Sequence, residues 1–205
     1  MAITINGSSN TITGLAAGGL PDDSINLADL SATGTASAST FLRGDNSWAT
    51  PTGGLWASYA VIWDRKSNGT DGGTFTTGAW RTRDLTHVYV DPDNIVTLSS
   101  NQFTLGAGTY FIKWSAPAAD VAQHATILYN ITDSQTESEG STQSADNSIQ
   151  QDNRSEGSTR LVLTGSKAFE IQHMCGSTSG NVWGFGSGQG GKPGVYTWVE
   201  IYKEA

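Results

Sequence analysis

The chain carries two different patterns of hydrophobic and polar residues. Residues 1–54 are rich in Gly, Ser, Thr and Ala and contain few large apolar side chains. From residue 55 onward, short runs of alternating apolar and polar residues are separated by turn-forming residues. Such alternation directs one face of a β-strand into a core and the other into solvent. The pattern predicts an extended stalk segment over 1–54 and a folded β head over 55–205.

The head sequence predicts an all-β sandwich. Counting the alternating runs gives roughly nine to eleven short strands with turn signals between them, which favours a sandwich and most simply a jelly roll. In the run 109–117, Tyr110, Ile112 and Trp114 share one face and Phe111 and Lys113 the other. Residues 134–158 are almost wholly polar, so we expect either a functional loop or an edge hairpin there.

The stalk segment cannot form a core of its own. Residues 31–40 contain only Ser, Thr, Ala and Gly, and such a segment does not offset its ordering entropy. It is either a flexible linker or a segment ordered by winding with identical chains, and we favour ordering in a trimer. Residues 50–54 are the expected hinge into the head.

Charge and cysteine content limit the possible partners. The net charge is −8 and the sequence pI is about 4.6, which argues against nucleic acid and anionic membranes as partners. Arg81 and Arg83, with Lys66 nearby, are a local basic group that we interpret as a solvated face. Cys175 is the single cysteine, so no intrachain disulfide is expected. Residues 1–4 do not resemble a signal peptide, so we expect synthesis in the cytosol and release by cell lysis.

The sequence offers no pattern typical of catalysis or metal binding. His87, His124, His173 and Cys175 lack the close spacing of metal ligands, and no nucleophile motif stands in a strand–turn–helix setting. Acidic residues at 91–94 could bind calcium, but turn formation explains them more simply. We therefore predict a protein that is not an enzyme and that needs no cofactor or metal.

Aromatic residues are the best candidates for ligand contact. Trp183 and Phe185 alternate with glycines, so their rings are either exposed for binding or packed inward at a crowded interface. The polar residues Asn147 and Gln151 in one loop, and Gln189 in the other, are further candidates for ligand binding.

Part of the head resembles a known superfamily. The run 102–112, with an apolar strand, a Gly turn and a Gly-x-Tyr strand, resembles the signature strand pair of the tumour necrosis factor and complement globular-head superfamily. The runs 126–130, 161–169 and 196–202 are similar to its later strands. The resemblance covers residues 56–205 and implies a jelly-roll head that forms a homotrimer. It also implies that Tyr110, Trp114, Tyr196, Trp198 and His173 lie at the trimer interface.

The first part of the chain resembles a different group of proteins. The stretch 30–48 is similar to runs in tail fibres of tailed bacteriophages that lead into a distal head. This resemblance implies a virion protein that attaches to a bacterial surface glycan or outer-membrane protein, and whose segment 1–54 docks on other tail proteins. We expect the loops within 134–158 and 176–194 to contact the receptor. The alternative is a structural decoration or trimerisation module of the virion with no ligand.

Overall fold

The chain divides into two compact units, Met1–Thr52 and Gly53–Ala205, which are described separately. The computed structural model describes residues 4–6, 8, 11–13, 31–51, 53–145, 152–182, 184–186, 188 and 190–205. The division lies two residues before the boundary that the sequence predicts. The described part of the chain contains no helix long and apolar enough to cross a bilayer.

The first unit contains two small antiparallel pairs. Strand β1 (Thr4–Asn6) pairs with β2 (Thr11–Thr13), and β3 (Phe41–Leu42) pairs with β4 (Trp48–Ala49). Phe41 is 46% exposed, so this apolar side chain is not covered by its own chain. The prediction that identical chains order this segment stays a prediction.

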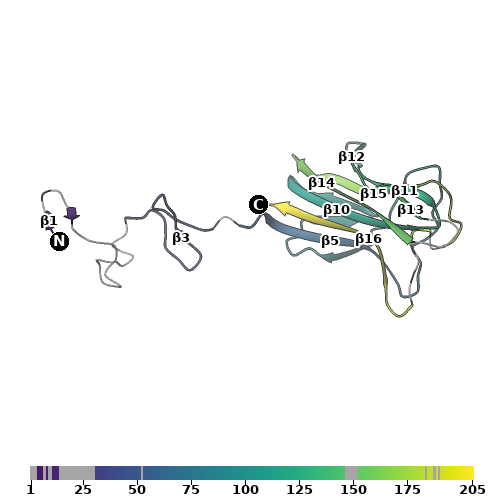
Figure 1. The fold of residues 1–205 in the computed structure, drawn as a ribbon, viewed down its shortest axis with the longest axis horizontal. Coiled ribbons are helices and arrows are strands. Elements are labelled where there is room, and N and C mark those ends of the chain that lie inside the picture. Colours follow the sequence, from purple (N-terminus) through teal and green to yellow (C-terminus); the bar gives the residue numbers. More distant parts are fainter. Residues whose placement is uncertain are drawn as a thin grey trace. The chain divides into compact units, whose positions relative to one another are not determined.

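The head is built from twelve strands in its described residues, and all of them belong to two sheets (Figure 1). These strands are β5 (Trp56–Lys66), β6 (Arg81–Thr82), β7 (His87–Val90), β8 (Val96–Ser99), β9 (Gln102–Leu105), β10 (Gly108–Ala119), β11 (Ala122–Asn130), β12 (Gln135–Glu139), β13 (Gln143–Ala145), β14 (Asp152–Leu163), β15 (Lys167–Cys175) and β16 (Gly194–Glu204).

The strand order defines a jelly roll. One sheet has the order β14-β10-β16-β5-β7, and the other has the order β12-β11-β15-β9-β8, with β13 beside β11 and β6 beside β15. Eight of these strands form the jelly roll, in chain order β5, β9, β10, β11, β12, β14, β15 and β16. The first, eighth, third and sixth of them are neighbours in one sheet, and the second, seventh, fourth and fifth are neighbours in the other. This is the double-sheet jelly-roll arrangement. The predicted all-β jelly-roll head is therefore confirmed.

The main core lies between the two sheets. Alternate residues of each strand point inward, as the period of two requires. The largest buried side chains of this core include Trp114, Tyr110, Phe103 and Phe169. The Trp114 ring also reaches the opposite sheet, where its Nε1 donates a hydrogen bond to Thr126 Oγ1 at 2.8 Å. The two sheets are thus joined by both apolar packing and a buried polar contact.

A second, smaller core packs under the loops. Phe75, Ala118, Val121, Ala145 and Cys175 form this cluster, with the half-buried Phe185 packed against it. The burial of Ala145 shows that part of the polar stretch is built into the fold. The polar stretch 134–158 supplies the edge strands β12 and β13 and the first half of β14. The sequence allowed either a functional loop or an edge hairpin here, and the described residues form strands at sheet edges.

Candidate functional site

The outer face of the five-stranded sheet is unusually aromatic. Strands β14, β10, β16 and β5 lie side by side in this sheet (Figure 1). The side chains that form what we call the aromatic face are Trp56, Tyr59, Trp63, Tyr89, Phe111, Trp198 and Tyr202. Each of them is at least partly exposed in the single chain, and Tyr59 and Tyr89 are 44% and 58% exposed. Exposed apolar surface of this kind marks interaction sites on soluble proteins.

Strand register gathers these rings into rows. Phe111 on β10 lies opposite Tyr202 on β16, which in turn lies opposite Tyr59 on β5. Trp56 extends this row, with its ring centroid 6.0 Å from Phe111 and 5.3 Å from Tyr202. Directly opposed residues in antiparallel strands share a face and contact one another. The result is a connected aromatic cluster at the end of the head where the chain enters β5 and leaves β16.

A second aromatic group lies further along β5. Trp63 lies opposite Trp198 on one side and His87 on the other. The Trp63 ring stacks on Tyr89 with the centroids 3.8 Å apart and the planes 14° from parallel. This group is at the β7 edge of the sheet.

Most residues predicted to line a trimer interface lie inside the single head. Tyr110 and Trp114 are each 1% exposed, Tyr196 is 3% exposed and His173 is fully buried. Because neighbouring elements of the same chain already cover these side chains, they offer little surface to a second copy. Their predicted role at a trimer interface stays a prediction, because the structure describes a single chain. Trp198 differs, since it lies on the aromatic face.

Phe185 packs inward rather than toward solvent. Its ring lies 4.3 Å from the Phe75 ring, and the Arg83 guanidinium carbon lies 4.1 Å from its centroid. This placement corresponds to the inward-packing alternative for Phe185. The other predicted ligand contacts, Asn147, Gln151, Trp183 and Gln189, lie outside the described residues.

Arg83 is the centre of a buried polar network, which corrects its interpretation as part of a solvated face. It is 1% exposed, and its guanidinium donates hydrogen bonds to Thr197 Oγ1 at 2.8 Å, Phe185 O at 3.0 Å and Pro117 O at 3.3 Å. Burial lowers the pKa of Arg83 to about 9, against the opposing effect of Asp64 and Asp84. The charge is retained at neutral pH because three acceptors replace its water.

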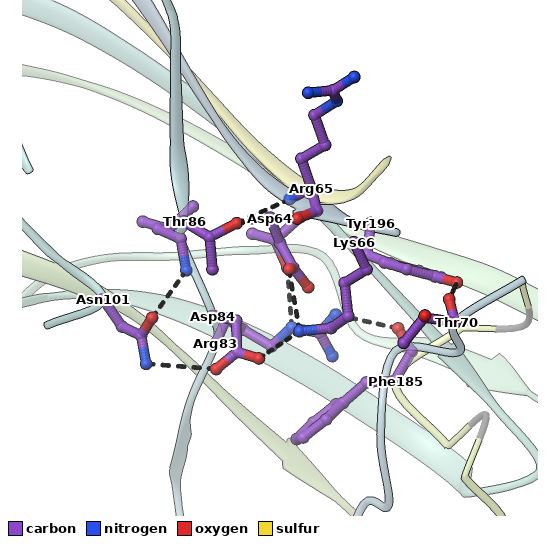
Figure 2. Close-up of polar contacts among 12 residues, drawn as sticks. Asp64, Arg65, Lys66, Thr70, Arg83, Asp84, Thr86, Asn101, Phe185 and Tyr196 are labelled. Carbon is purple, nitrogen blue, oxygen red and sulfur yellow. Dashed lines mark hydrogen bonds and ion pairs between the residues drawn. The ribbon is translucent and has the colours of Figure 1, made fainter. Parts of the chain in front are cut away.

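Lys66 and two aspartates extend this network (Figure 2). Lys66 Nζ lies 2.5 Å from Asp84 Oδ2 and 3.1 Å from Asp64 Oδ1. Burial raises the pKa of Asp64, and the neighbouring Lys66 partly offsets this effect. Of the basic group noted in the sequence, Arg83 and Lys66 are therefore structural, while Arg81 remains exposed.

Two histidines form a buried pair beside the second core. His124 Nδ1 and His173 Nε2 are 2.9 Å apart, while His124 Nε2 and His173 Nδ1 are buried without a hydrogen-bond partner. Burial, with Arg83 nearby, lowers the pKa of His124 to about 4 and that of His173 well below its usual range. Both rings are therefore neutral at pH 7.

The acidic turn residues satisfy the backbone around them. Asp91 accepts hydrogen bonds from the backbone N–H groups of Ile95 and Val96, and Asp93 accepts one from the Ser58 hydroxyl. This is the turn chemistry that the sequence favours over calcium binding. In the described ranges, no group of three His, Cys, Asp or Glu side chains is placed to hold a metal ion.

Sequence reasoning missed the residues that make up most of the aromatic face. Tyr59, Trp63, Phe111 and Tyr202 share a face only once the strands are paired, although each occupies an outward position of an alternating run. Arg65 was also missed. It points outward from β5, two residues beyond Trp63. The signal available in the sequence was the presence of aromatic residues on both faces of β10, with Tyr110 and Trp114 on one and Phe111 on the other.

Comparisons with solved structures find distant likenesses to jelly-roll heads. These are murine APRIL (10% identity, TM-score 0.45, covering 71% of this chain and 98% of that chain), the globular domain of zebrafish complement 1qA (9%, 0.44, 71% and 94%) and the Eiger TNF of S. frugiperda (14%, 0.44, 72% and 92%). No protein-family model and no curated protein matches the chain. The jelly-roll class of the head rests on its own strand order.

Proposed function

We propose that this chain is the receptor-binding part of a bacteriophage tail fibre. In this proposal it is a homotrimer that attaches the virion to the bacterial surface through its β heads. The observation that carries the proposal is the aromatic face, a row of rings that a single chain leaves uncovered. The Ser/Thr-rich stretch 30–48 resembles tail-fibre sequence, and this resemblance supports the proposal that the assembly is part of a fibre.

The occupant that fits the row Trp56, Phe111, Tyr202 and Tyr59 is a second copy of the head. Charged side chains flank the row in opposite signs, with Lys113 Nζ 3.4 Å from Glu200 Oε2 and Arg160 Nε 2.6 Å from Glu204 Oε1. These charges are balanced within the chain, so a second copy can cover the row without facing an unpaired charge. Cyclic symmetry closes such contacts into a ring, and three chains suit a fibre.

Attachment then depends on several weak contacts acting together. In a trimer, each head presents the same binding surface, and linked sites raise overall binding by roughly 10² to 10⁴ through effective concentration. No covalent chemistry is required. Residues 1–54 would dock on another tail protein, and the chain would be located in the virion.

A structural role in the virion is the second candidate. The observation that favours it is the placement of the polar stretch, because β12, β13 and β14 build much of it into sheet edges instead of a projecting loop. In that case the head would hold three chains together without a ligand of its own.

Binding of the purified full-length chain to bacteria separates the two roles. A fluorescent label on the chain and a panel of bacterial strains with different surface polysaccharides provide the assay. We expect saturable binding to at least one strain. The variant Phe111→Glu should bind more weakly, because a charge in the row prevents assembly and the avidity of a trimer is lost. A well-formed trimer that binds no strain would contradict attachment and favour the structural role.

A further inference from the structure

We infer that a pocket at the β7 edge of the head binds an acidic sugar, with Arg65 holding its carboxylate or phosphate group and the ring of His87 contacting the sugar. This inference rests on the proposed attachment function and deepens it by naming a class of ligand. The pocket has a volume of about 270 Å³ and is lined by Arg65, Lys66, Ser67, Thr86, His87 and Pro193. That volume suits one sugar unit rather than a drug-sized molecule.

The charge of this pocket is opposite to that of the protein. The chain has a net charge of −8, yet none of the described residues that line the pocket is acidic. Arg65 is exposed, and its guanidinium makes no ion pair or hydrogen bond within the described residues. Figure 2 shows this side chain extended away from the Asp64, Lys66 and Asp84 group. Arg65 is thus a free cation with its donors available to an anion.

Lys66 has a different role at the same place. Its ammonium group is held between Asp84 and Asp64, at 2.5 Å and 3.1 Å, so its charge is already balanced. Arginine is the better residue for an anion, because its planar fork binds a carboxylate or phosphate with two parallel hydrogen bonds. The specificity for an anion therefore rests on Arg65.

The backbone beneath Arg65 is fixed in position. The Thr86 hydroxyl accepts a hydrogen bond from Arg65 N at 3.0 Å and donates one to Arg65 O at 3.1 Å. Thr86 N donates in turn to Trp63 O at 2.8 Å. These bonds join β5 to the segment before β7, so the two sides of the pocket keep their spacing. A prearranged site loses less entropy when it binds a ligand.

An aromatic surface adjoins this cation. The His87 ring lines the same pocket and lies 6.3 Å from the Trp63 ring, which in turn stacks on Tyr89. A partly exposed ring that is held in place can contact the C–H side of a sugar at little entropic cost. Arg65 lies two residues beyond Trp63 on the same face of β5. A ring contact and an anion contact at this spacing match a sugar that carries an acidic group.

The pocket is separate from the proposed contact between copies. Trp63 follows Tyr59 by four residues along β5, which corresponds to about 13 Å of strand. The β7 edge also lies at the end of the sheet, beyond β5. A ligand at Arg65 is therefore compatible with assembly through the row that contains Tyr59.

Direct binding of defined sugars tests the site. Isothermal titration of the full-length protein would use trigalacturonic acid, the neutral analogue galactotriose, and galactose 6-phosphate. We expect both acidic sugars to bind in preference to galactotriose, with the tighter of the two showing whether carboxylate or phosphate is the natural group. Arg65→Met should weaken binding roughly ten- to hundredfold, as expected for the loss of a charge-assisted bidentate contact. Arg81→Met removes another exposed arginine outside the pocket and should leave binding unchanged.

The outcomes separate this inference from the function on which it rests. Equal affinity for galactotriose and the acidic sugars, no binding of either acidic sugar, or full affinity in Arg65→Met would overturn the acidic-sugar site. If the labelled protein still binds bacterial cells in that case, the attachment function stands and the receptor contact lies elsewhere. If acidic sugars bind through Arg65 while no cells bind, the site stands and attachment is contradicted.

Discussion

Gly157 makes room for the largest side chain of the core. A Cβ atom at this position would lie 2.0 Å from Cζ2 of Trp114, far inside contact distance. Trp114 cannot move aside easily, because it is 1% exposed and its Nε1 is bonded to Thr126. We predict that Gly157→Ala lowers the free energy of unfolding by about 1–3 kcal/mol or more, as overpacked cores do. Urea denaturation followed by tryptophan fluorescence measures this loss.

Gly106→Ala is the matched control. A Cβ atom at Gly106 meets no atom within 4 Å, so this change should leave the unfolding midpoint nearly unaltered. Equal stability of the two variants would show that the Trp114 ring does not occupy the space above Gly157.

The buried pair His124 and His173 predicts acid sensitivity. The folded state holds the pKa of His124 at about 4, below its ordinary 6.5, so the unfolded chain binds more protons between these values. The free energy of unfolding should therefore fall as the pH drops from about 6.5 toward 4, by up to about 1.4 kcal/mol per pH unit for each residue that titrates. Urea midpoints at pH 7 and pH 5 measure the slope.

Substitution at both positions isolates the histidine contribution. The double variant His124→Gln/His173→Gln should show a flatter dependence over this range, whereas His87→Gln, at a half-buried position outside the pair, should retain the dependence of the wild type. A wild-type protein that is equally stable at pH 7 and pH 5 would contradict this account of the pair.

At the scale of elements, Arg83 joins parts of the head that are distant in sequence. Its guanidinium bonds to Pro117 on β10, Thr197 on β16 and the backbone of Phe185. Arg83→Met keeps the apolar stem but leaves these acceptors and the buried Asp64 without the charge. We predict a loss of about 3–5 kcal/mol in the free energy of unfolding, the usual result of breaking a buried charged network.

Arg65→Met is the control for this substitution, because Arg65 is exposed and its guanidinium makes no hydrogen bond or ion pair in the described residues. Its unfolding midpoint should match that of the wild type in the same denaturation experiment. Similar stability of Arg83→Met and the wild type would mean that the loops are held by apolar packing alone.

Strands and turns were predictable from the sequence because alternation and turn residues are local signals. The polar residues Ser100 and Asn101 form a tight hairpin between β8 and β9, with positive φ values of 52° and 65°. Local signals do not say which face of a strand is inside when both faces are apolar. On β10, Tyr110 and Trp114 were expected at an interface, but they face the core, and Phe111 faces outward.

The candidate site was less predictable than the fold for the same reason. Arg83 and Arg65 look alike in sequence, yet one is buried and the other free, because burial depends on which distant acceptors reach the side chain. The aromatic face likewise exists only through the register of β5, β16 and β10. Both features depend on contacts between residues far apart in the chain.

At the scale of the whole molecule, assembly would explain why the head exposes so many rings. Trp56, Tyr59, Phe111 and Tyr202 form one connected surface, and covering it with a second copy removes apolar area from water. The proposed attachment gains its avidity from this assembly, and the proposed acidic-sugar pocket lies outside the contact. The account therefore depends first on whether copies of the chain associate through this row.

The solution mass of the full-length protein tests that claim most directly. Light scattering coupled to size-exclusion chromatography should give about 65 kDa, three chains of 21.6 kDa, for the wild type. Phe111→Glu should give the mass of one chain, because it places a charge in the row. Met174→Glu, a control at a side chain that is 40% exposed on β15 in the other sheet, should remain a trimer. A wild-type mass of one chain, or a trimer that Phe111→Glu leaves intact, would contradict the account.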